Sequence, residues 1–361
     1  MNLLFLSHLH GRPHAGPTYS VPNQVMAQSE YDNVFWYNTI SSAVESWKKI
    51  SMYHDLSDFP KGTLSDLPEP FCRPDLIIIE GFYGLATSKI VKEIIRESIP
   101  FVIVPRGELT AQAQKRHHLK KSIANIIKCY SYAGKAAAIQ YLTKQEEADS
   151  GEKWNKKSLI IPNGINMPEI YKREFSHEGV RCISIGRIEP YQKGLDLLID
   201  ACIGIKEELQ SANCTILLCG PDRVNKLKDL QQKVLEGGLK DIISFHDGVF
   251  GNEKVTMLLS HDVFLMPSRF EGHPLALIEA MSYGLPCVAT TGSNMREEID
   301  DMNAGWTSDT TEDGIKEALR RMIRDKQSIE EKGLNARELA SKYNWSNIAA
   351  IGHESYGSLI S

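Results

Sequence analysis

Two successive series of short apolar runs, separated by helix-length amphipathic stretches, constrain the fold of this chain most strongly. The first series comprises Leu3–Leu6, Val34–Tyr37, Leu76–Ile79, Phe101–Val104, Ala137–Leu142 and Leu159–Ile161. The second comprises Arg181–Ile185, Thr215–Cys219, Ile242–Phe245, Val263–Met266, Cys287–Ala289 and Gly305–Thr307. Continuous apolar runs between helices are typical of parallel strands that are covered on both faces. The pattern therefore predicts an α/β protein of two doubly wound domains rather than one barrel.

The polar stretch Glu169–Gly179 separates the two series and is interpreted as the linker region. A chain of 361 residues is long enough for two domains of about 150 residues each. We expect an N-terminal domain at residues 1–168, a C-terminal domain at residues 169–342 and a final helix at residues 343–361, which follows no further strand.

The composition excludes several classes of protein. Hydrophobic residues make up 42% of the chain and charged residues 24%, values typical of soluble globular proteins and not of disordered or collagen-like chains. No apolar run approaches the ~20 residues of a membrane span, and no basic segment precedes the short apolar N-terminus as it would in a signal peptide. The seven scattered cysteines fit a reducing cytoplasm better than a disulfide framework or a zinc ribbon. A cytoplasmic location is expected.

The first segment whose residues suit ligand binding follows the expected strand that ends at Ile185. Arg187 and Lys193 lie in the loop there, before a helix expected from Leu195. Open α/β sheets bind ligands at the carboxyl ends of their strands. A guanidinium, an ammonium and a helix N-terminus together suit a diphosphate group. The alternative is a loop with ordinary surface charges.

The second segment follows the expected strand Val263–Met266. Glu271, Gly272 and His273 form a loop, and Pro274 suits the first turn of a helix that runs from Leu275 to Tyr283. Gly272 lets a ligand approach the backbone closely, and the amide groups near 273–275 face out of the helix N-terminus.

Glu279 lies inside that helix, eight residues after Glu271. Its neighbours Ala276, Ala280 and Met281 are apolar, so its carboxylate is expected to be buried and to need a partner. A pair of hydroxyl groups on a ligand would be a suitable hydrogen-bond partner for this carboxylate. The alternative, a glutamate on the solvent face, fits the apolar neighbours less well.

These two segments resemble a known family. GRIEPYQKG at 186–194 and EGHPLALIEAMSYGLPCVAT at 271–290 are similar to motifs of the retaining nucleotide-sugar glycosyltransferases of glycosyltransferase family 4. IPNGIN at 161–166 and AGPTYSV at 15–21 match more loosely. The resemblance implies the GT-B fold, in which two Rossmann-like domains face each other across a cleft. The N-terminal domain would lie on the acceptor side, the C-terminal domain would bind the nucleotide sugar, and the final helix would cross back to the N-terminal domain.

The resemblance also implies roles by position. Arg187 and Lys193 would hold the donor diphosphate, and Glu279 would accept hydrogen bonds from the ribose hydroxyls. Contacts to the transferred sugar and the distal phosphate would come from Glu271, Gly272, His273, Pro274 and Leu275. Gly16 would let a loop of the first domain reach the phosphates or the acceptor; the family usually has a second glycine there, and this chain has Ala15.

Arg106, Gly107 and Glu108 follow the expected strand Phe101–Val104 and are predicted to face the cleft. They are candidates for contacts to the acceptor or to the transferred sugar. Many relatives have a histidine in this region, where this chain has Arg106.

The implied reaction transfers a sugar from a nucleotide-diphosphate sugar to a glycan or lipid-linked glycan acceptor, as in the synthesis of bacterial surface polysaccharides. Arg187, Lys193 and Glu271 would act in catalysis. No Asp-x-Asp motif is present and His8, His10 and His14 lack further ligand types nearby, so no metal and no cofactor is expected, and no nucleic acid partner. The alternatives are a sugar-nucleotide epimerase with the same fold and a non-catalytic protein that binds nucleotide sugars.

A basic stretch suggests a membrane contact. Residues 89–135 hold ten lysines and arginines and three acidic residues. Within this stretch, Ala111–Lys135 shows the apolar spacing of an amphipathic helix, which suits peripheral contact with an anionic inner leaflet. The alternative is a helix whose apolar face packs against the core of the domain.

Overall fold

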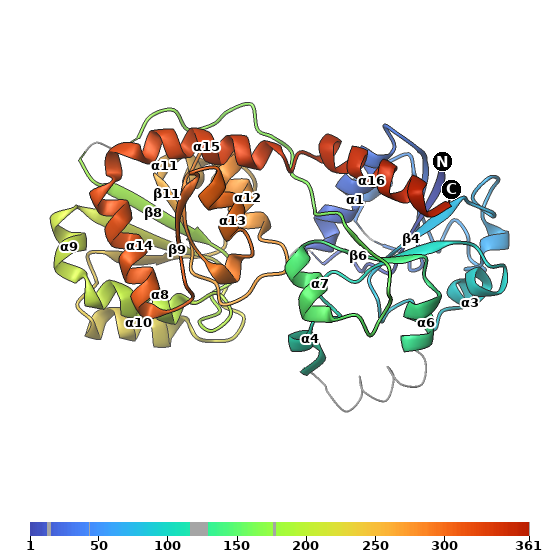
Figure 1. Cartoon of the computed structure of the whole chain (residues 1–361), viewed down its shortest axis with the longest axis horizontal. Helices are drawn as coiled ribbons and strands as arrows, with labels where there is room; N and C mark the ends of the chain where they lie inside the picture. Colours follow the sequence, from blue (N-terminus) through green and yellow to red (C-terminus); the bar gives the residue numbers. More distant parts are fainter. Residues whose placement is uncertain (13–15, 43, 116–128, 176–177, 361) are drawn as a thin grey trace. The chain divides into compact units, whose positions relative to one another are not determined.

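The computed structural model of the chain describes residues 1–12, 16–42, 44–115, 129–175 and 178–360. Contacts between residues divide the chain into two compact units (Figure 1). The N-terminal unit comprises Met1–Gly164 together with Trp345–Ser361, and the C-terminal unit comprises Ile165–Asn344. Each unit is built on one parallel sheet.

The sheet of the N-terminal unit has the strand order β3-β2-β1-β4-β5-β6-β7, and every neighbouring pair is parallel. Its strands are β1 (Asn2–Ser7), β2 (Asn33–Asn38), β3 (Tyr53–Asp55), β4 (Leu76–Glu80), β5 (Phe101–Val104), β6 (Ala138–Tyr141) and β7 (Ser158–Ile160). The six strands expected from the first series of apolar runs are all present. The short edge strand β3 was not predicted, because its sequence Tyr-His-Asp contains no aliphatic residue.

The helices of this unit cover both faces of its sheet. They are α1 (Pro17–Gln28), α2 (Glu45–Lys48), α3 (Lys89–Arg96), α4 (Ala111–Lys115), α6 (Tyr130–Lys135), α7 (Lys144–Ser150) and α16 (Trp345–Ile360), with a 3₁₀ turn at η1 (Leu64–Asp66). Local sequence explains α3 well. The Ser88 hydroxyl accepts a hydrogen bond from the Val91 N–H at 3.3 Å, which caps the helix, and Ile90, Val91 and Ile94 form its buried side.

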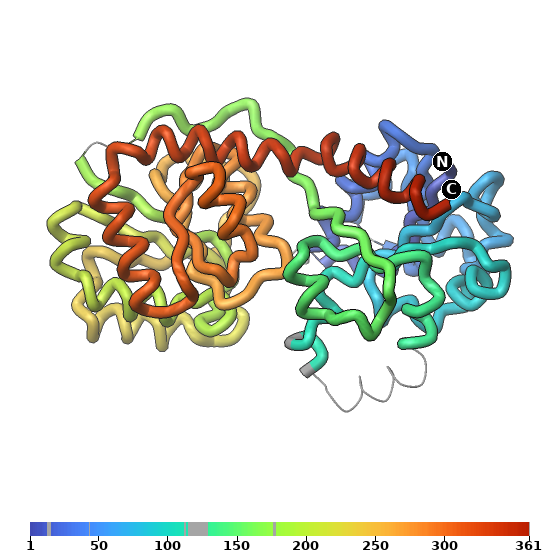
Figure 2. The backbone as a smooth tube through the Cα atoms, in the orientation of Figure 1, coloured from blue at the N-terminus to red at the C-terminus, as the bar shows by residue number. Residues whose placement is uncertain are grey.

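Helix α16 belongs to the N-terminal unit although it ends the chain. It packs against α1 (Figure 2). Its buried residues Trp345, Ile348 and Tyr356 share a core with Leu3 and Phe5 of β1. The last segment is therefore helical, as predicted, and completes the core of the first unit.

The boundaries between the units differ from the expected ones by a few residues. They fall at 164/165 and 344/345 rather than at 168/169 and 342/343. The Ile165 N–H donates to the Tyr343 carbonyl at 2.8 Å, and Ile165 forms an isolated β-bridge with Asn344. This pairing ties both crossing segments to the C-terminal unit.

The sheet of the C-terminal unit has the strand order β10-β9-β8-β11-β12-β13 and is parallel throughout. Its strands are β8 (Val180–Ile185), β9 (Cys214–Cys219), β10 (Ile243–His246), β11 (Val263–Met266), β12 (Cys287–Thr290) and β13 (Gly305–Ser308). All six expected strands are present. Cys214 and Cys219 are buried at the two ends of β9.

Helices cover both faces of this second sheet as well. They are α8 (Leu195–Gly204), α9 (Lys206–Ser211), α10 (Leu227–Glu236), α11 (Gly251–Ser260), α12 (Leu275–Ser282), α13 (Arg296–Asp301), α14 (Glu312–Arg324) and α15 (Ile329–Ser341), with 3₁₀ turns at η3 (Thr291–Ser293) and η4 (Lys326–Ser328). Leu198 of α8 packs in the core on one face, and Leu277 of α12 packs in the core on the other. Both units are thus doubly wound, as predicted.

The described part of the chain contains no helix that is both long and apolar enough to cross a bilayer. Most of the basic segment 111–135, residues 116–128, lies outside the described residues. Only its two ends are described, as α4 and α6. A membrane-facing amphipathic helix in this segment therefore stays a prediction.

Candidate functional site

The candidate site lies where the strand order of the C-terminal sheet reverses. Strands β8 and β11 are neighbours there, although β9 and β10 lie between them in the sequence. The loop after β8, residues 186–194, and the loop after β11, residues 267–274, leave the carboxyl ends of these two strands. We call them the β8 loop and the β11 loop. Doubly wound sheets form their ligand crevice at such a reversal.

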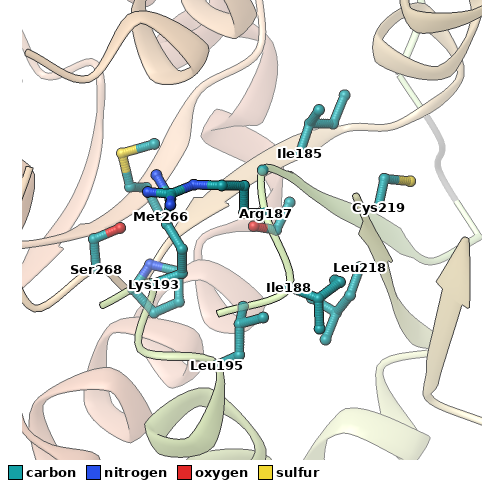
Figure 3. A pocket seen from close by; sticks show the side chains of 12 residues that line it. Ile185, Arg187, Ile188, Lys193, Leu195, Leu218, Cys219, Met266 and Ser268 are labelled. Carbon is teal, nitrogen blue, oxygen red and sulfur yellow. The ribbon is translucent and has the colours of Figure 1, made fainter. Parts of the chain in front are cut away.

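The two loops and the strand ends beside them line a small hollow of about 10 Å³ (Figure 3). Its lining includes Arg187 and Lys193 from the β8 loop and Pro267 and Ser268 from the β11 loop. Apolar side chains of the strand ends, such as Met266, also line it. The hollow thus brings two cations together with apolar side chains.

Lys193 and Glu271 meet at this site although 78 residues separate them. The Lys193 Nζ lies 2.6 Å from the Glu271 Oε1, and the Ser268 hydroxyl donates to the same oxygen at 2.6 Å. The side chains of Lys193 and Glu271 are 19% and 9% exposed, so the pair is partly removed from water. Arg187 is more exposed and donates from Nη2 to the Gln192 Oε1 at 2.9 Å. The structure thus brings Lys193 and Glu271 into contact, and Arg187 and Lys193 line the same hollow.

Gly194 brings the two loops close together. It lies at the N-terminus of α8 with φ +63°, a left-handed conformation that glycine adopts without strain. A Cβ atom at this position would lie 1.8 Å from the Pro267 carbonyl oxygen. A side chain would therefore push the β8 loop away from the β11 loop.

Replacing Gly194 by alanine is expected to lower the free energy of unfolding of the C-terminal unit by at least ~1–2 kcal/mol, because an L-residue is strained in the left-handed region and the Cβ also meets the Pro267 carbonyl. Denaturant unfolding measures the change. Gly134→Ala is the control, since a Cβ there meets no atom within 4 Å and its φ is not positive. A neutral Gly194→Ala variant would contradict the close approach of the loops.

The β11 loop leads into α12. Pro274 precedes the helix as its N-cap, one residue earlier than the predicted first-turn position, and Leu275 begins it. Gly272 is exposed, and a Cβ there would meet no atom within 4 Å, so the space above its backbone is open. The His273 ring lies 5.6 Å from that of Tyr343. The backbone at 272–275 is therefore accessible at Gly272 and packed at its neighbours.

The expected burial of Glu279 is wrong. Its side chain is 33% exposed and forms an ion pair with Lys254 of α11, at 2.6 Å between Nζ and Oε1. The apolar neighbours along α12 indicated burial, but α11 supplies a cation that no local pattern reveals. A ligand hydroxyl at Glu279 would have to share the carboxylate with Lys254.

Arg106 of the N-terminal unit is held by several side chains of its own unit. It follows β5 in the left-handed region, with φ +50°, and its side chain is 8% exposed. Its Nε donates to the Glu80 Oε2 at 2.7 Å. Its Nη1 donates to Ser20 at 3.0 Å and Asn163 at 2.9 Å, and its Nη2 donates to Gln24 at 2.9 Å. These contacts anchor Arg106 within its unit, and its predicted contact with the acceptor or the transferred sugar stays a prediction.

Gly107 and Glu108 also contact protein groups. The Gly107 N–H donates to the Glu146 carboxylate. Burial raises the pKa of the Glu146 carboxyl, and its backbone hydrogen bonds oppose this effect. The Glu108 Oε2 accepts hydrogen bonds from the N–H groups of Phe82 at 2.6 Å and Tyr83 at 3.2 Å. Both residues thus help to hold the loops after β4 and β5.

A second hollow lies at the reversal of the N-terminal sheet, between the ends of β1 and β4. Its lining includes His8, Glu80, Arg106 and Glu108. Burial and the neighbouring His10 lower the pKa of His8, whose Nδ1 lies 2.8 Å from the Thr39 hydroxyl. His8 and Glu80 were not among the predicted site residues. Each of them lies at the carboxyl end of a strand beside the reversal of the strand order. This position is the sequence signal that could have identified them.

Gly16 is the N-cap of α1, with φ −48°. A Cβ there would meet no atom within 4 Å. The backbone at this position therefore does not need glycine's conformational freedom, and the space beside it is open.

Comparison with family models matches residues 169–339 to Glycosyl transferases group 1. Among curated proteins, the chain is 27% identical over 212 residues to D-inositol 3-phosphate glycosyltransferase of Paenarthrobacter aurescens, a match that covers 56% of this chain and 52% of the relative. It is 31% identical over 141 residues to the amylovoran biosynthesis glycosyltransferase AmsK of Erwinia amylovora, covering 37% and 33%. The chain thus spans between a third and about half of the length of these relatives.

Among solved structures, the chain is similar to HepE of Anabaena in complex with UDP. The TM-score is 0.72 at 17% sequence identity, and the match covers 99% of this chain and 100% of the HepE chain. At this identity the likeness establishes the fold. The chain therefore has the GT-B fold, and its residues 169–339, which carry Arg187, Lys193, Glu271 and Glu279, match the group 1 glycosyl transferases.

Proposed function

We propose that the chain is a retaining glycosyltransferase that moves a sugar from a nucleotide-diphosphate sugar to a glycan or lipid-linked glycan acceptor. One observation carries the proposal. The Lys193 ammonium, the Glu271 carboxylate and the Arg187 guanidinium gather at the reversal of the C-terminal sheet, where a ligand crevice is expected. Two cations beside a carboxylate suit a diphosphate that is bonded to a sugar.

The chemistry follows from the leaving group. When the bond between the anomeric carbon and the diphosphate oxygen breaks, negative charge develops on the diphosphate. A cation about 4 Å away stabilises such a charge by about 4 kcal/mol at an effective dielectric constant of 20. Arg187 and Lys193 would supply this stabilisation in place of a metal ion. We therefore propose that the reaction is metal-independent.

Retention of configuration follows if the acceptor attacks from the face that the diphosphate leaves. In this scheme the acceptor hydroxyl oxygen bonds to the anomeric carbon, and its proton passes to an oxygen of the departing β-phosphate. Glu271 would orient the sugar and stabilise the positive charge that develops on it. Because the Glu271 Oε1 already accepts from Lys193 and Ser268, its direction is set before the donor arrives.

The comparisons support this proposal at two points. HepE, which shares the fold, was solved with UDP. AmsK, which resembles part of this chain, carries amylovoran biosynthesis in its name. By analogy, we propose a nucleoside diphosphate as the leaving group and the assembly of a surface polysaccharide or glycolipid as the setting.

The test is a panel of UDP, GDP, ADP, CMP and dTDP, with thermal shift and calorimetry as readouts. One nucleoside diphosphate is expected to stabilise the chain selectively, by about 2.7 kcal/mol at a concentration of 100 Kd. The effect is expected to persist in EDTA. Glu279→Ala is expected to weaken binding by about tenfold, because the proposed acceptor for the ribose hydroxyls is lost.

Glu236→Ala is the matched control. Glu236 is an exposed glutamate on α10 that accepts a hydrogen bond from Gln232. Its replacement is expected to leave binding unchanged. If no member of the panel stabilises the chain, the donor site is absent and the proposed function fails.

A further inference from the structure

Arg269 joins the β8 loop to the β11 loop. Its backbone N–H donates to the Gln192 carbonyl at 2.9 Å, and its Nη1 donates to the Tyr191 carbonyl at 2.8 Å. Its guanidinium also binds Asp196 through two parallel hydrogen bonds, of 2.7 Å from Nη1 and 2.9 Å from Nη2. Arg269 thus contacts the β8 loop and the first turn of α8 while it belongs to the β11 loop.

These contacts fall next to the residues of the proposed donor site. Gln192 directly precedes Lys193, and its side chain accepts the hydrogen bond from Arg187. Arg269 lies two residues before Glu271. Arg269 therefore fixes the backbone next to Lys193 relative to the carboxylate of Glu271. The same contact fixes Gln192, whose side chain orients Arg187.

The chemistry of arginine suits this task. A planar guanidinium holds a carboxylate in one orientation through a pair of hydrogen bonds, which a lysine ammonium cannot do. The Asp196 hydrogen bonds raise the pKa of Arg269 further above its ordinary value. The Tyr191 ring lies 4.7 Å from the guanidinium carbon and covers its face. The side chain is thus held from several directions.

We propose that Arg269 is a positioning residue for the donor site: it sets the separation of Arg187 and Lys193 from Glu271 and does not touch the donor itself. The inference rests on the proposed function, because it assigns those cations to a donor diphosphate. Misplacement of a binding group by about 1 Å is enough to lose much of its effect.

The experiment is a double-mutant cycle on the full chain, with the nucleoside diphosphate that binds best in the panel as the probe. Calorimetry well below the melting temperature measures binding to the unsubstituted chain and to Arg269→Lys. Arg269→Lys is expected to weaken binding about tenfold. The same substitution is then made in the Arg187→Ala/Lys193→Ala chain and followed at millimolar nucleotide. In this doubly substituted chain, Arg269→Lys is expected to change the affinity by less than twofold, because the two cations that Arg269 positions are absent.

Arg320→Lys is the matched control. Arg320 forms a similar pair with Glu208, in which Nε donates to Oε2 at 3.1 Å and Nη2 donates to Oε1 at 2.8 Å. This pair joins α14 to α9 and involves neither loop of the site. Its replacement is expected to leave nucleotide binding unchanged. A merely structural role for Arg269 would lower the melting temperature and leave the affinity of the folded protein intact.

The outcomes separate the inference from the proposed function. If the unsubstituted chain binds a nucleoside diphosphate, Lys193→Ala weakens binding and Arg269→Lys does not, the inference fails and the proposed function stands. If Arg269→Lys weakens binding equally in both backgrounds, Arg269 acts independently of the two cations and the inference also fails. If the unsubstituted chain binds no member of the panel, the proposed function fails and the inference fails with it.

Discussion

Replacing Lys193 by alanine is expected to lower kcat about 10²–10³-fold, the loss that follows removal of one group that stabilises a developing negative charge in a preorganised site. The Lys193 ammonium is the less exposed of the two cations and lies 2.6 Å from Glu271. Its removal takes away charge at the diphosphate and also the partner that helps to orient Glu271. We expect Arg187→Ala to lower kcat by a similar factor.

Release of nucleoside diphosphate from the donor sugar measures the effect. Lys226→Ala is the control, because Lys226 is an exposed lysine in the same unit that pairs with Asp229. The variants should keep the melting temperature of the unsubstituted chain within a few degrees, so that a lower kcat reflects a defect in catalysis and not in folding. Near-normal turnover in both Lys193→Ala and Arg187→Ala would refute the assigned roles.

Replacing Arg106 by alanine is expected to lower the free energy of unfolding of the N-terminal unit by about 3–5 kcal/mol, the cost of breaking a buried ion pair from one side. The Glu80 side chain is fully buried, and Arg106 is the cation that pairs with it. Ser20, Gln24 and Asn163 would lose their guanidinium partner in the same substitution. The combined loss places this variant among the strongly destabilised ones.

Denaturant unfolding followed by tryptophan fluorescence suits this measurement, since Trp36, Trp47 and Trp154 are buried in the N-terminal unit. Adding Glu80→Gln to Arg106→Ala is expected to recover part of the loss, because it removes the buried charge. Arg96→Ala is the control. Arg96 is 71% exposed, so solvent screens its ion pairs with Glu93 and Glu97, which predicts a change below about 1 kcal/mol. A small effect of Arg106→Ala would contradict the structural role assigned to its buried contacts.

Most of the fold could be predicted because its signal is local. A parallel strand that is covered on both faces needs a continuous apolar run, and each of the twelve predicted runs forms a strand. Strand β3 lacks that signal, since its edge position tolerates Tyr53, His54 and Asp55. The unit boundaries depend on the pairing of Ile165 with Asn344, which are distant in sequence, so no local pattern reports them.

The candidate site was predictable only as far as strand topology fixes it. Lys193 and Glu271 follow neighbouring strands at a reversal, so their meeting follows from the order of the sheet. The directions of individual side chains depend on tertiary neighbours instead. Glu80 of a neighbouring strand pairs with Arg106, and Lys254 from another helix reaches Glu279. The local sequence around Arg106 or Glu279 does not indicate either of these contacts.

The return of α16 to the N-terminal unit has a consequence for synthesis on the ribosome. Residues 165–344 can complete their own core as soon as they have emerged. The N-terminal unit, although made first, lacks Trp345, Ile348 and Tyr356 until α16 has emerged. Until then part of its apolar surface, including the side of the sheet that carries Leu3 and Phe5, stays without its full cover. The C-terminal unit is thus able to fold first, and the N-terminal unit waits until α16 has been made.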